Sequence, residues 1–418
     1  MKILALHNFY GSAEPSGENL VFEAETALLR SRGHDVRTFT RRSDEIRDQG
    51  KLGLVRGALA TPWNPYMIRA VRRILEQFQP DVVHVHNTFP LISPGVFHAI
   101  DGSAARVITL HNYRLFCAAA TPMREGRVCV LCLDRRSSWP AFQHGCYRSS
   151  RIASAPPAIS VALHRRIGTW ERKVDAFIAL TQFQRERMTA AGLPHDRVWV
   201  KPNFFAGRPE VFPWFERTPR AVFVGRISED KGVSDVVDAW LTWGQAAPEL
   251  ALVGDGPLRT ELEGRVREAN RENIRFVGRV SPQEAQRWIA SSRLLVLASK
   301  WFEGFPLVLC EAFASGTPAL VSGVGALPQL VGAGAGAVFR MGDVRHLLEV
   351  ASGLWNHPRR LSRMALRARY EFDSRYTEDI NYEQLMNVYD KAIRVRRLAS
   401  RSDSRVHVQW KKSSISRD

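Results

Sequence analysis

Residues 220–225 read RAVFVG, and this short apolar run begins the series that decides the fold of the second half of the chain. The runs that follow it are LALVG at 250–254, IRFVG at 274–278, LLVLAS at 294–299 and PALVS at 318–322. Amphipathic stretches such as LRTELEGRVREAN at 258–270 separate the runs, which is the pattern of parallel strands covered by helices on both faces. The second half of the chain, which contains these runs, is therefore predicted to be a doubly wound α/β domain.

The first half repeats this alternation. An apolar run KILAL at 2–6 leads to a predicted helix from Glu18 to Arg32, which Gly33 ends because glycine adopts the left-handed conformation of a helix stop. Further runs, DVVHVH at 81–86 and RVITLH at 106–111, have helical material between them. The first half is also predicted to be doubly wound.

Length and proline content predict the domain boundaries. A chain of 418 residues exceeds what one hydrophobic core usually supports, and residues 201–220 carry four prolines with no helical or strand period. We expect two domains that face each other across a cleft, at 1–203 and 204–375. A helix at 376–397 is expected to pack back on the first domain, before a basic, disordered tail at 398–418 that has too little apolar content to fold.

The composition is that of a folded protein with a strong positive charge. Lys and Arg total 59 against 42 Asp and Glu, which gives a net charge of +17 and attracts anions such as phosphates, acidic lipids or nucleic acid. The charge is equally consistent with Arg-rich solvated faces. We find neither a signal peptide nor an apolar run long enough to span a membrane, so the chain is expected to be cytoplasmic.

The segment 301–320, WFEGFPLVLCEAFASGTPAL, indicates a ligand site. Pro306 suits the first turn of a helix and Gly316 its exit, so a helix is predicted over 306–315. Glu303 then precedes the helix and Glu311 lies within it, about 12 Å away, which is too far for the close carboxylate pair of a glycoside hydrolase. We expect the two carboxylates to hold two parts of one long ligand, with backbone N–H groups at the helix start cradling a phosphate or a sugar hydroxyl.

Two loops earlier in the chain are expected to contribute to the same ligand site, one through positive charge and the other through close approach of its backbone to the ligand. In FVGRISEDKG at 223–232, Gly225 ends a strand, and Arg226 and Lys231 follow at the edge of the sheet where open α/β folds bind ligands. Their charges could neutralise a departing diphosphate in place of a metal ion. In LVGDGPL at 252–258 a Gly-Asp-Gly-Pro turn lets the backbone approach a ligand, although by itself this motif is better explained as an ordinary turn.

Taken together, GRISEDKG, VGDGP and the Glu303 to Glu311 spacing resemble glycosyltransferase family 4, whose members are retaining enzymes of the GT-B fold; the resemblance covers about residues 1–390. It implies that Arg226 and Lys231 hold the donor diphosphate and that Glu303 contacts the transferred sugar. Glu311 would bind the ribose hydroxyls. The remaining donor-binding positions that it implies are Gly225, Gly254, Gly256, Gly278, Arg279, Gly304, Phe305, Pro306 and Leu307, with the base near Gly278 and Arg279.

The resemblance extends to the first half, the expected acceptor-binding domain. The loop GSAEPSGEN at 11–19 resembles the family's glycine loop, which makes Gly17 a phosphate contact, although Ser16 stands where a second glycine is commoner. The segments DVVHVHN and TLHNYR resemble the family's histidine-bearing strand ends, so His111 is expected to touch the donor sugar. His84 and His86 alternate on one strand and point to the same face, where packing, acceptor contact or a metal are all open.

The predicted function is therefore retaining transfer of a sugar from a UDP- or GDP-linked donor to a glycan or polyprenyl-linked acceptor, in cell-surface polysaccharide synthesis. No cofactor is expected for catalysis. The alternatives are a GT-B nucleotide-sugar epimerase or phosphorylase and, from another class, a nucleic-acid-binding protein. No ribonucleoprotein or helix-turn-helix pattern supports the last, so no nucleic-acid partner is expected.

Two further features stay open at this level. Cys117, Cys129, Cys132 and Cys146 have a spacing that can complete a structural zinc site, but in a reducing compartment they could equally be four thiols. Residues 51–79 and 151–173 mix basic with aromatic and aliphatic side chains, as a segment on an acidic membrane surface does. Ordinary amphipathic helices have the same pattern, so peripheral binding to the inner face of the membrane is one of two interpretations.

Overall fold

The computed structural model describes residues 1–11, 16–102 and 104–415. Its contacts divide the chain into two compact units. The first contains residues 1–120, 131–201 and 382–418, and the second contains 121–130 and 202–381. Each unit has its own parallel sheet, so the predicted α/β class with two doubly wound sheets is confirmed.

The first unit is built on a six-stranded sheet of order β2-β1-β3-β4-β7-β8, with every neighbouring pair parallel. Its strands are β1 Lys2–Phe9, β2 Asp35–Arg42, β3 Val82–Asn87, β4 Ala105–Leu110, β7 Ala176–Ala179 and β8 Val198–Val200. All residues of β3 and β4 are buried, because helices cover both faces of a parallel sheet.

The helices of this unit include α1, which begins at Gly17 and ends at Ser31. The others are α2 Asp44–Asp48, α3 Gly50–Ala60, α4 Pro65–Phe78, η1 Pro94–His98, α5 Leu131–Asp134, α6 Trp139–Gln143, α7 Arg151–Arg166, α8 Thr169–Arg172, α9 Gln182–Ala190 and η2 His195–Arg197. Leu385, Tyr389 and Ala392 of the C-terminal helix join the core of this sheet and are fully buried. That helix therefore completes the first unit although it lies at the other end of the chain.

The second unit has a six-stranded parallel sheet of order β11-β10-β9-β12-β13-β14. Its strands are β9 Thr218–Val224, β10 Glu249–Val253, β11 Ile274–Gly278, β12 Ser292–Leu297, β13 Ala319–Ser322 and β14 Gly336–Phe339. A short antiparallel hairpin, β5 Met123–Arg124 with β6 Arg127–Val128, also groups with this unit.

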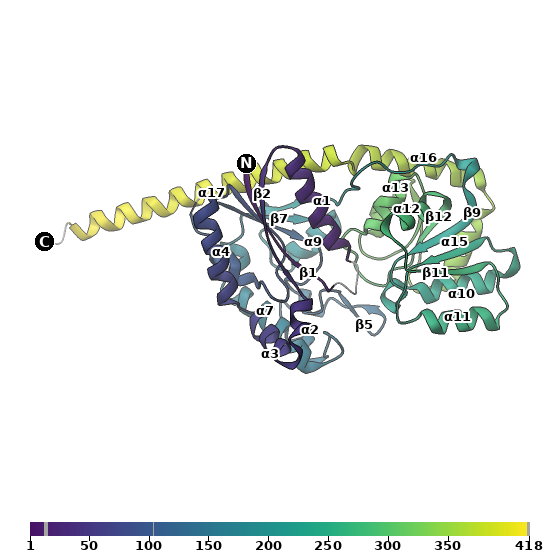
Figure 1. Ribbon diagram of the computed structural model, residues 1–418, viewed down its shortest axis with the longest axis horizontal. Helices are drawn as coiled ribbons and strands as arrows, with labels where there is room; N and C mark the ends of the chain where they lie inside the picture. Colours follow the sequence, from purple (N-terminus) through teal and green to yellow (C-terminus); the bar gives the residue numbers. More distant parts are fainter. Residues whose placement is uncertain (12–15, 103, 416–418) are drawn as a thin grey trace. The chain divides into compact units, whose positions relative to one another are not determined.

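The longer helices of the second unit fall into two groups, and the helices within each group contact one another (Figure 1). One group is α10 Val233–Trp243, α11 Arg259–Glu268 and α15 Val344–Trp355, and the other is α12 Pro282–Ala290, α13 Leu307–Ala314 and α16 Pro358–Arg375. The shorter segments are η3 Trp214–Glu216, η4 Glu229–Lys231, η5 Gly244–Ala246 and α14 Leu327–Val331. Trp240 of α10 is fully buried in the core that β9, β10 and β12 share with the first group.

The strand order places a topological switch point in each sheet. In the second unit the chain leaves β9 toward β10 on one side and later returns to β12 on the other. In the first unit β1 lies between β2 and β3 in the same way. Ligands of open α/β sheets bind outside the carboxyl ends of the strands at such a point, which is where the chain places its candidate site residues.

The C-terminal helix differs from the prediction. Helix α17 runs from Glu378 to Ile415 and is drawn as one unbroken helix in Figure 1, so residues 398–415 are helical where a disordered tail was expected. Residues 378–415 contain neither proline nor glycine, and Arg and Lys are good helix formers, so nothing in the backbone interrupts the helix. Low apolar content argues against a packed core and does not by itself argue against a helix. Residues 416–418 lie outside the described residues.

Among the described residues, none of the helices combines the length and apolar character that a bilayer-spanning segment needs.

Candidate active site

Three glycines shape the carboxyl edge of the second sheet. Gly225, Gly254 and Gly278 stand at the ends of β9, β10 and β11, and the N–H of Gly254 donates to the carbonyl of Gly278 at 2.9 Å. A Cβ atom on Gly254 would lie 1.9 Å from the carbonyl oxygen of Gly225, and one on Gly256 would lie 2.4 Å from that of Ile227. Gly254 and Gly256 are therefore required by the close approach of neighbouring turns, and donor contact at all four of these glycines stays a prediction.

Lys231 and Glu303 form an ion pair at the switch point of this sheet. The Nζ atom of Lys231 lies 2.6 Å from Oε1 of Glu303, and the hydroxyl of Ser299, just after β12, donates to the same oxygen at 2.7 Å. Glu303 is only 5% exposed, whereas Lys231 is half-buried and also lies 5.4 Å from the centre of the Trp301 ring. The structure thus brings together two of the four residues predicted to be catalytic.

Arg226 follows β9 at the same edge and is exposed. Its guanidinium lies 3.5 Å from the carboxylate of Asp230, which also accepts a hydrogen bond from Ser228. Arg279 is likewise exposed at the end of β11. Both cations therefore lie at carboxyl ends of strands, as the sequence predicts for Arg226.

Helix α13 supplies the second carboxylate. It begins at Leu307 and ends at Ala314, close to the predicted range, with Pro306 at the position before its first turn. Gly304 and Phe305 are buried just ahead of it, and the first N–H groups of a helix have no partner within the helix. The N–H groups at the start of α13 therefore suit an anion or a hydroxyl oxygen as a hydrogen-bond acceptor.

Glu311 lies on α13 with a half-buried carboxyl group. The side chain of Gln286 on α12 donates to its Oε1 at 3.2 Å. Burial raises the pKa of Glu311, and the Gln286 hydrogen bond only partly opposes that shift. A carboxylate held in this way gains from ligand hydroxyls that donate to it, as the paired hydroxyls of a ribose would.

In the first unit, His111 comes directly after β4 and is half-buried. Its Nε2 atom lies 3.0 Å from Nδ1 of His86, and the two rings stack with centroids 5.2 Å apart. Burial, followed by the nearby His86, lowers the pKa of His111 well below its usual value. His111 is therefore uncharged at neutral pH.

The loop before α1 is partly outside the described residues, because positions 12–15 are not described. Gly17 is exposed and is the first residue of α1, so a phosphate contact there stays a prediction. Next to it, Glu18 accepts a hydrogen bond from Asn112 at 3.3 Å. Burial raises the pKa of Glu18 to about 8, and the nearby Arg114 opposes this shift.

A buried polar cluster that was not predicted from the sequence lies behind His111. Glu25, on the buried face of α1, lies against His84 and His86 of β3 and pairs with Lys201. One signal could have found it, because Glu25 falls four residues after Val21 and three before Leu28, on the apolar stripe of a predicted helix. A charged residue at such a position needs a buried partner.

The four clustered cysteines keep both of their interpretations. Cys117 and Cys132 are buried, while Cys129 and Cys146 are partly exposed. Burial, with a further contribution from Cys132, raises the pKa of the Cys117 thiol to about 12. A structural zinc at these positions stays a prediction. Cys310 is buried within α13, where its thiol packs in the core.

Two family models match the chain. A model described as Glycosyltransferase Family 4 matches residues 17–205, and one described as Glycosyl transferases group 1 matches residues 218–357. The first spans most of the first unit, and the second spans the second sheet and the connecting segments that carry Lys231, Glu303 and Glu311.

Relatives agree with these models. A GDP-mannose-dependent alpha-(1-6)-phosphatidylinositol dimannoside mannosyltransferase of Mycobacterium tuberculosis is 26% identical over 357 residues, which is 81% of this chain and 83% of the relative. The amylovoran biosynthesis glycosyltransferase AmsK of Erwinia amylovora is 22% identical over 231 residues, or 52% of this chain and 56% of its own. Among solved structures, Anabaena Alr3699/HepE in complex with UDP is similar with a TM-score of 0.60 and 17% identity. The similarity covers 93% of this chain and 100% of the Anabaena chain.

The two parallel-sheet units, the residues at their switch points and these likenesses define a glycosyltransferase of GT-B architecture. More narrowly, the chain belongs to glycosyltransferase family 4, as its motifs predict. Its relatives act in the synthesis of polysaccharides and glycolipids.

Proposed function

We propose that this enzyme transfers a sugar, with retention of anomeric configuration, from a nucleoside diphosphate donor to a glycan or lipid-linked acceptor of cell-surface polysaccharide synthesis. One observation carries the proposal. Arg226 and Lys231, the start of α13 and the half-buried Glu311 lie around the switch point of the second sheet. The two cations suit the diphosphate of such a donor, the start of α13 suits the sugar, and Glu311 suits the ribose.

Arg226 and Lys231 would hold the diphosphate. Negative charge grows on the departing nucleoside diphosphate during transfer, so fixed cations stabilise the transition state more than the ground state. This takes the place of a divalent metal ion, and we propose that the reaction needs none. The partner of Lys231 is Glu303, so a donor that bound there would engage both members of the pair, Lys231 through phosphate and Glu303 through the transferred sugar.

Glu311 would bind the ribose hydroxyls. Its carboxyl group is half-buried, and an ionised carboxylate in that setting lacks the hydration that it would have in water. Two ribose hydroxyls restore the missing donors. GDP and UDP both carry these hydroxyls, so the choice between them falls to the residues near the base, where Gly278 and Arg279 are our candidates. The mannosyltransferase relative uses GDP-mannose, while the Anabaena structure contains UDP.

A panel of sugar nucleotides tested by thermal shift identifies the donor. A ligand that binds only the folded state at 100 times its Kd stabilises it by about 2.7 kcal/mol, so the true donor should raise the melting temperature clearly. Arg226→Ala and Lys231→Ala should each remove most of this shift. The matched control is Arg267→Ala, which removes an exposed cation of α11 in the same unit and should leave the shift unchanged. If no sugar nucleotide stabilises the wild-type enzyme, the proposal is wrong.

We also propose that the first unit binds the acidic inner face of the membrane, where a polyprenyl-linked acceptor would be found. Exposed apolar side chains gather on α3, among them Leu52 at 66% and Leu59 at 73% exposure, and exposed Tyr66 follows at the start of α4. Basic residues accompany them, including exposed Arg56 and, on α4, Arg72 and Arg73. Each basic residue near an acidic leaflet contributes about 1 kcal/mol, so several together hold a protein there reversibly.

A further inference from the structure

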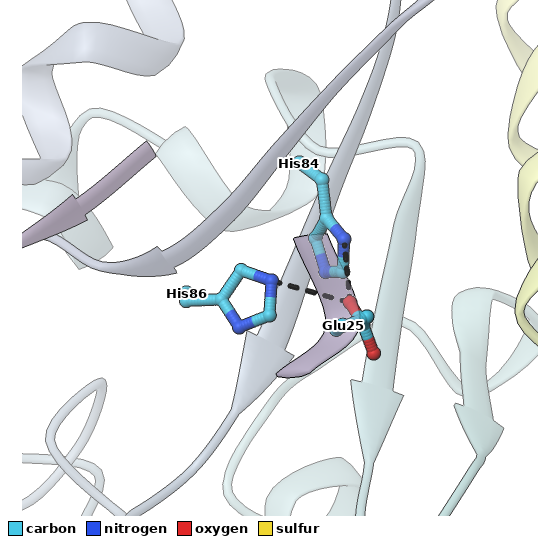
Figure 2. A group of neighbouring side chains, drawn as sticks. All are labelled: Glu25, His84 and His86. Atoms are coloured by element: carbon cyan, nitrogen blue, oxygen red, sulfur yellow. Dashed lines mark ion pairs between the residues drawn. The ribbon is translucent and has the colours of Figure 1, made fainter. Parts of the chain in front are cut away.

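A buried carboxylate lies behind the histidines of the first unit. The Oε1 atom of Glu25 lies 3.3 Å from Nδ1 of His84 and 3.3 Å from Nε2 of His86, and Figure 2 shows the two ion pairs as dashed lines that meet at this oxygen. The side chains of all three residues are 1% exposed. A carboxylate so far from solvent requires compensating charge.

Lys201 supplies that charge. Its Nζ atom lies 2.8 Å from Oε2 of Glu25, and its side chain is also 1% exposed. Lys201 lies just after β8, so the cluster joins α1, β3 and the edge of the sheet. One anion and one cation balance here, and a third charge would have to be buried at high cost. This cost favours neutral imidazoles beside the pair.

The same geometry argues against a metal ion at this cluster, although one carboxylate oxygen and two imidazole nitrogens lie close enough to share one. The Lys201 ammonium already lies beside the carboxylate. The ring nitrogens of His84 also have other partners, because Nδ1 lies 2.8 Å from the Tyr389 hydroxyl and Nε2 lies 2.8 Å from the Thr109 hydroxyl. A metal would have to displace these groups and sit next to a buried cation.

The carboxylate decides which nitrogen of His86 carries the proton. Nε2 of His86 faces Glu25, and an imidazole lone pair directed at a carboxylate 3.3 Å away would be repelled. The neutral ring therefore carries its proton on Nε2 and presents an unprotonated Nδ1. That Nδ1 atom lies 3.0 Å from Nε2 of His111, and two lone pairs cannot share a hydrogen bond. His111 must donate from Nε2.

We infer that Glu25 and His86 are positioning residues, which fix His111 as the tautomer that is protonated on Nε2 and accepts a hydrogen bond at Nδ1. The inference rests on the proposed function, in which His111 touches the donor sugar, and it gives His111 a free acceptor nitrogen for a sugar hydroxyl. A neutral acceptor nitrogen attracts an O–H donor and repels a phosphate oxygen. The low pKa of His111 agrees with this role, since it keeps the ring uncharged among His7, His84, His86 and Glu25.

Histidine tautomers are read directly by long-range proton–nitrogen NMR on enzyme labelled with ¹⁵N-histidine. Protonated and unprotonated ring nitrogens have well-separated shifts, and the loss of one signal set in His111→Gln assigns that residue. We expect a protonated Nε2 and an unprotonated Nδ1 at His111 in the wild-type enzyme without substrate. A protonated Nδ1, or a doubly protonated ring at neutral pH, would overturn the inference. This result does not depend on activity, so it stands apart from the proposed function.

Variants then test the role of Glu25. Glu25→Gln/Lys201→Met removes both members of the buried pair together, which avoids leaving one charge unpaired. We expect His111 to populate both tautomers in this variant, and kcat to fall by up to about 100-fold with little change in the donor KM. Glu23→Gln, on the exposed face of α1, is the matched control and should change neither. An unchanged His111 tautomer in the folded double variant would overturn the inference.

If the double variant does not fold, the wild-type tautomer still decides the question. Zinc is the remaining control. Addition of zinc to the wild-type enzyme should leave the His84 and His86 signals in place, and a specific stoichiometric shift of both would assign the cluster to metal binding and overturn the inference.

Discussion

The ammonium group of Lys231 lies 2.6 Å from the carboxylate of Glu303, and the Ser299 hydroxyl shares the same oxygen. The two residues are 72 positions apart in the chain, and the switch point between β9 and β12 brings them together. The pair therefore links two parts of the proposed site, the loop that holds phosphate and the segment that precedes α13. Its disruption should affect both folding and ligand binding.

We expect Lys231→Ala to destabilise the enzyme by about 1–3 kcal/mol, because it leaves Glu303 buried without its cation. Lys231→Ala/Glu303→Gln should recover most of that stability, since no unpaired charge remains, but should not recover transferase activity. Urea unfolding and initial rates measure the two effects. A single variant that is as stable as the wild type would contradict the account of the pair.

Glu311→Gln should separate stability from binding. The pKa of Glu311 is raised in the folded protein, so its contribution to stability is greatest below about pH 4.5 and is lost as pH rises through the folded pKa. Once it ionises, the side chain therefore costs stability, and above the folded pKa the neutral amide should raise the melting temperature of the nucleotide-free enzyme. Nucleotide affinity should fall, because an amide cannot accept two ribose hydroxyls as a carboxylate does.

The control for that experiment is Glu261→Gln, which changes an exposed carboxylate of α11 and should alter neither quantity. Glu311→Gln enzyme that binds the nucleotide as tightly as the wild type would show that the ribose lies elsewhere.

Activity should survive the removal of divalent metal ions. If Arg226 and Lys231 provide the charge that stabilises the departing diphosphate, an excess of EDTA should change the initial rate by less than about twofold. The rate should fall steeply in Arg226→Ala under the same conditions. Loss of activity in EDTA that magnesium or manganese restores would contradict metal independence.

The product should keep the anomeric configuration of the donor. Proton NMR of the glycoside product distinguishes the two anomers. Retention would agree with attack on the face from which the diphosphate leaves, a step that depends on holding donor and acceptor together. An inverted product would remove the proposed stereochemistry and leave the transferase class in place.

Acidic vesicles should bind the enzyme through α3. Leu54→Ser/Leu59→Ser removes exposed apolar side chains and should reduce co-sedimentation with phosphatidylglycerol vesicles, with little effect on folding because both residues are more than half exposed. Leu366→Ser is a matched control, since Leu366 has the same 73% exposure as Leu59 but lies on α16 of the second unit. Equal binding of all three proteins would rule out this surface.

Local signals predicted the parts of the site that depend on local structure. Pro306 and Gly316 bracket α13 because their backbone preferences act within one turn, and the observed bounds differ from the prediction by one residue at each end. Family resemblance assigned the same loops to glycosyltransferase family 4, and the family models agree.

Contacts between distant residues could not be predicted in this way. Glu25 and Lys201 are 176 positions apart, and only the folded sheet shows that they pair. The hairpin at 121–130 groups with the second unit although both of its sequence neighbours belong to the first, and nothing in its composition indicates this. Low apolar content predicts a disordered tail at 398–418, but it does not prevent α17 from extending to Ile415, because a helix needs no packed core to form its backbone hydrogen bonds.

A crystal structure of the enzyme with its sugar nucleotide would locate the donor site. We expect a diphosphate within hydrogen-bonding distance of Arg226 and Lys231, with the ribose hydroxyls donating to Glu311. A nucleotide bound elsewhere, with these three side chains making no contact to it, would show that the proposed donor site is wrong.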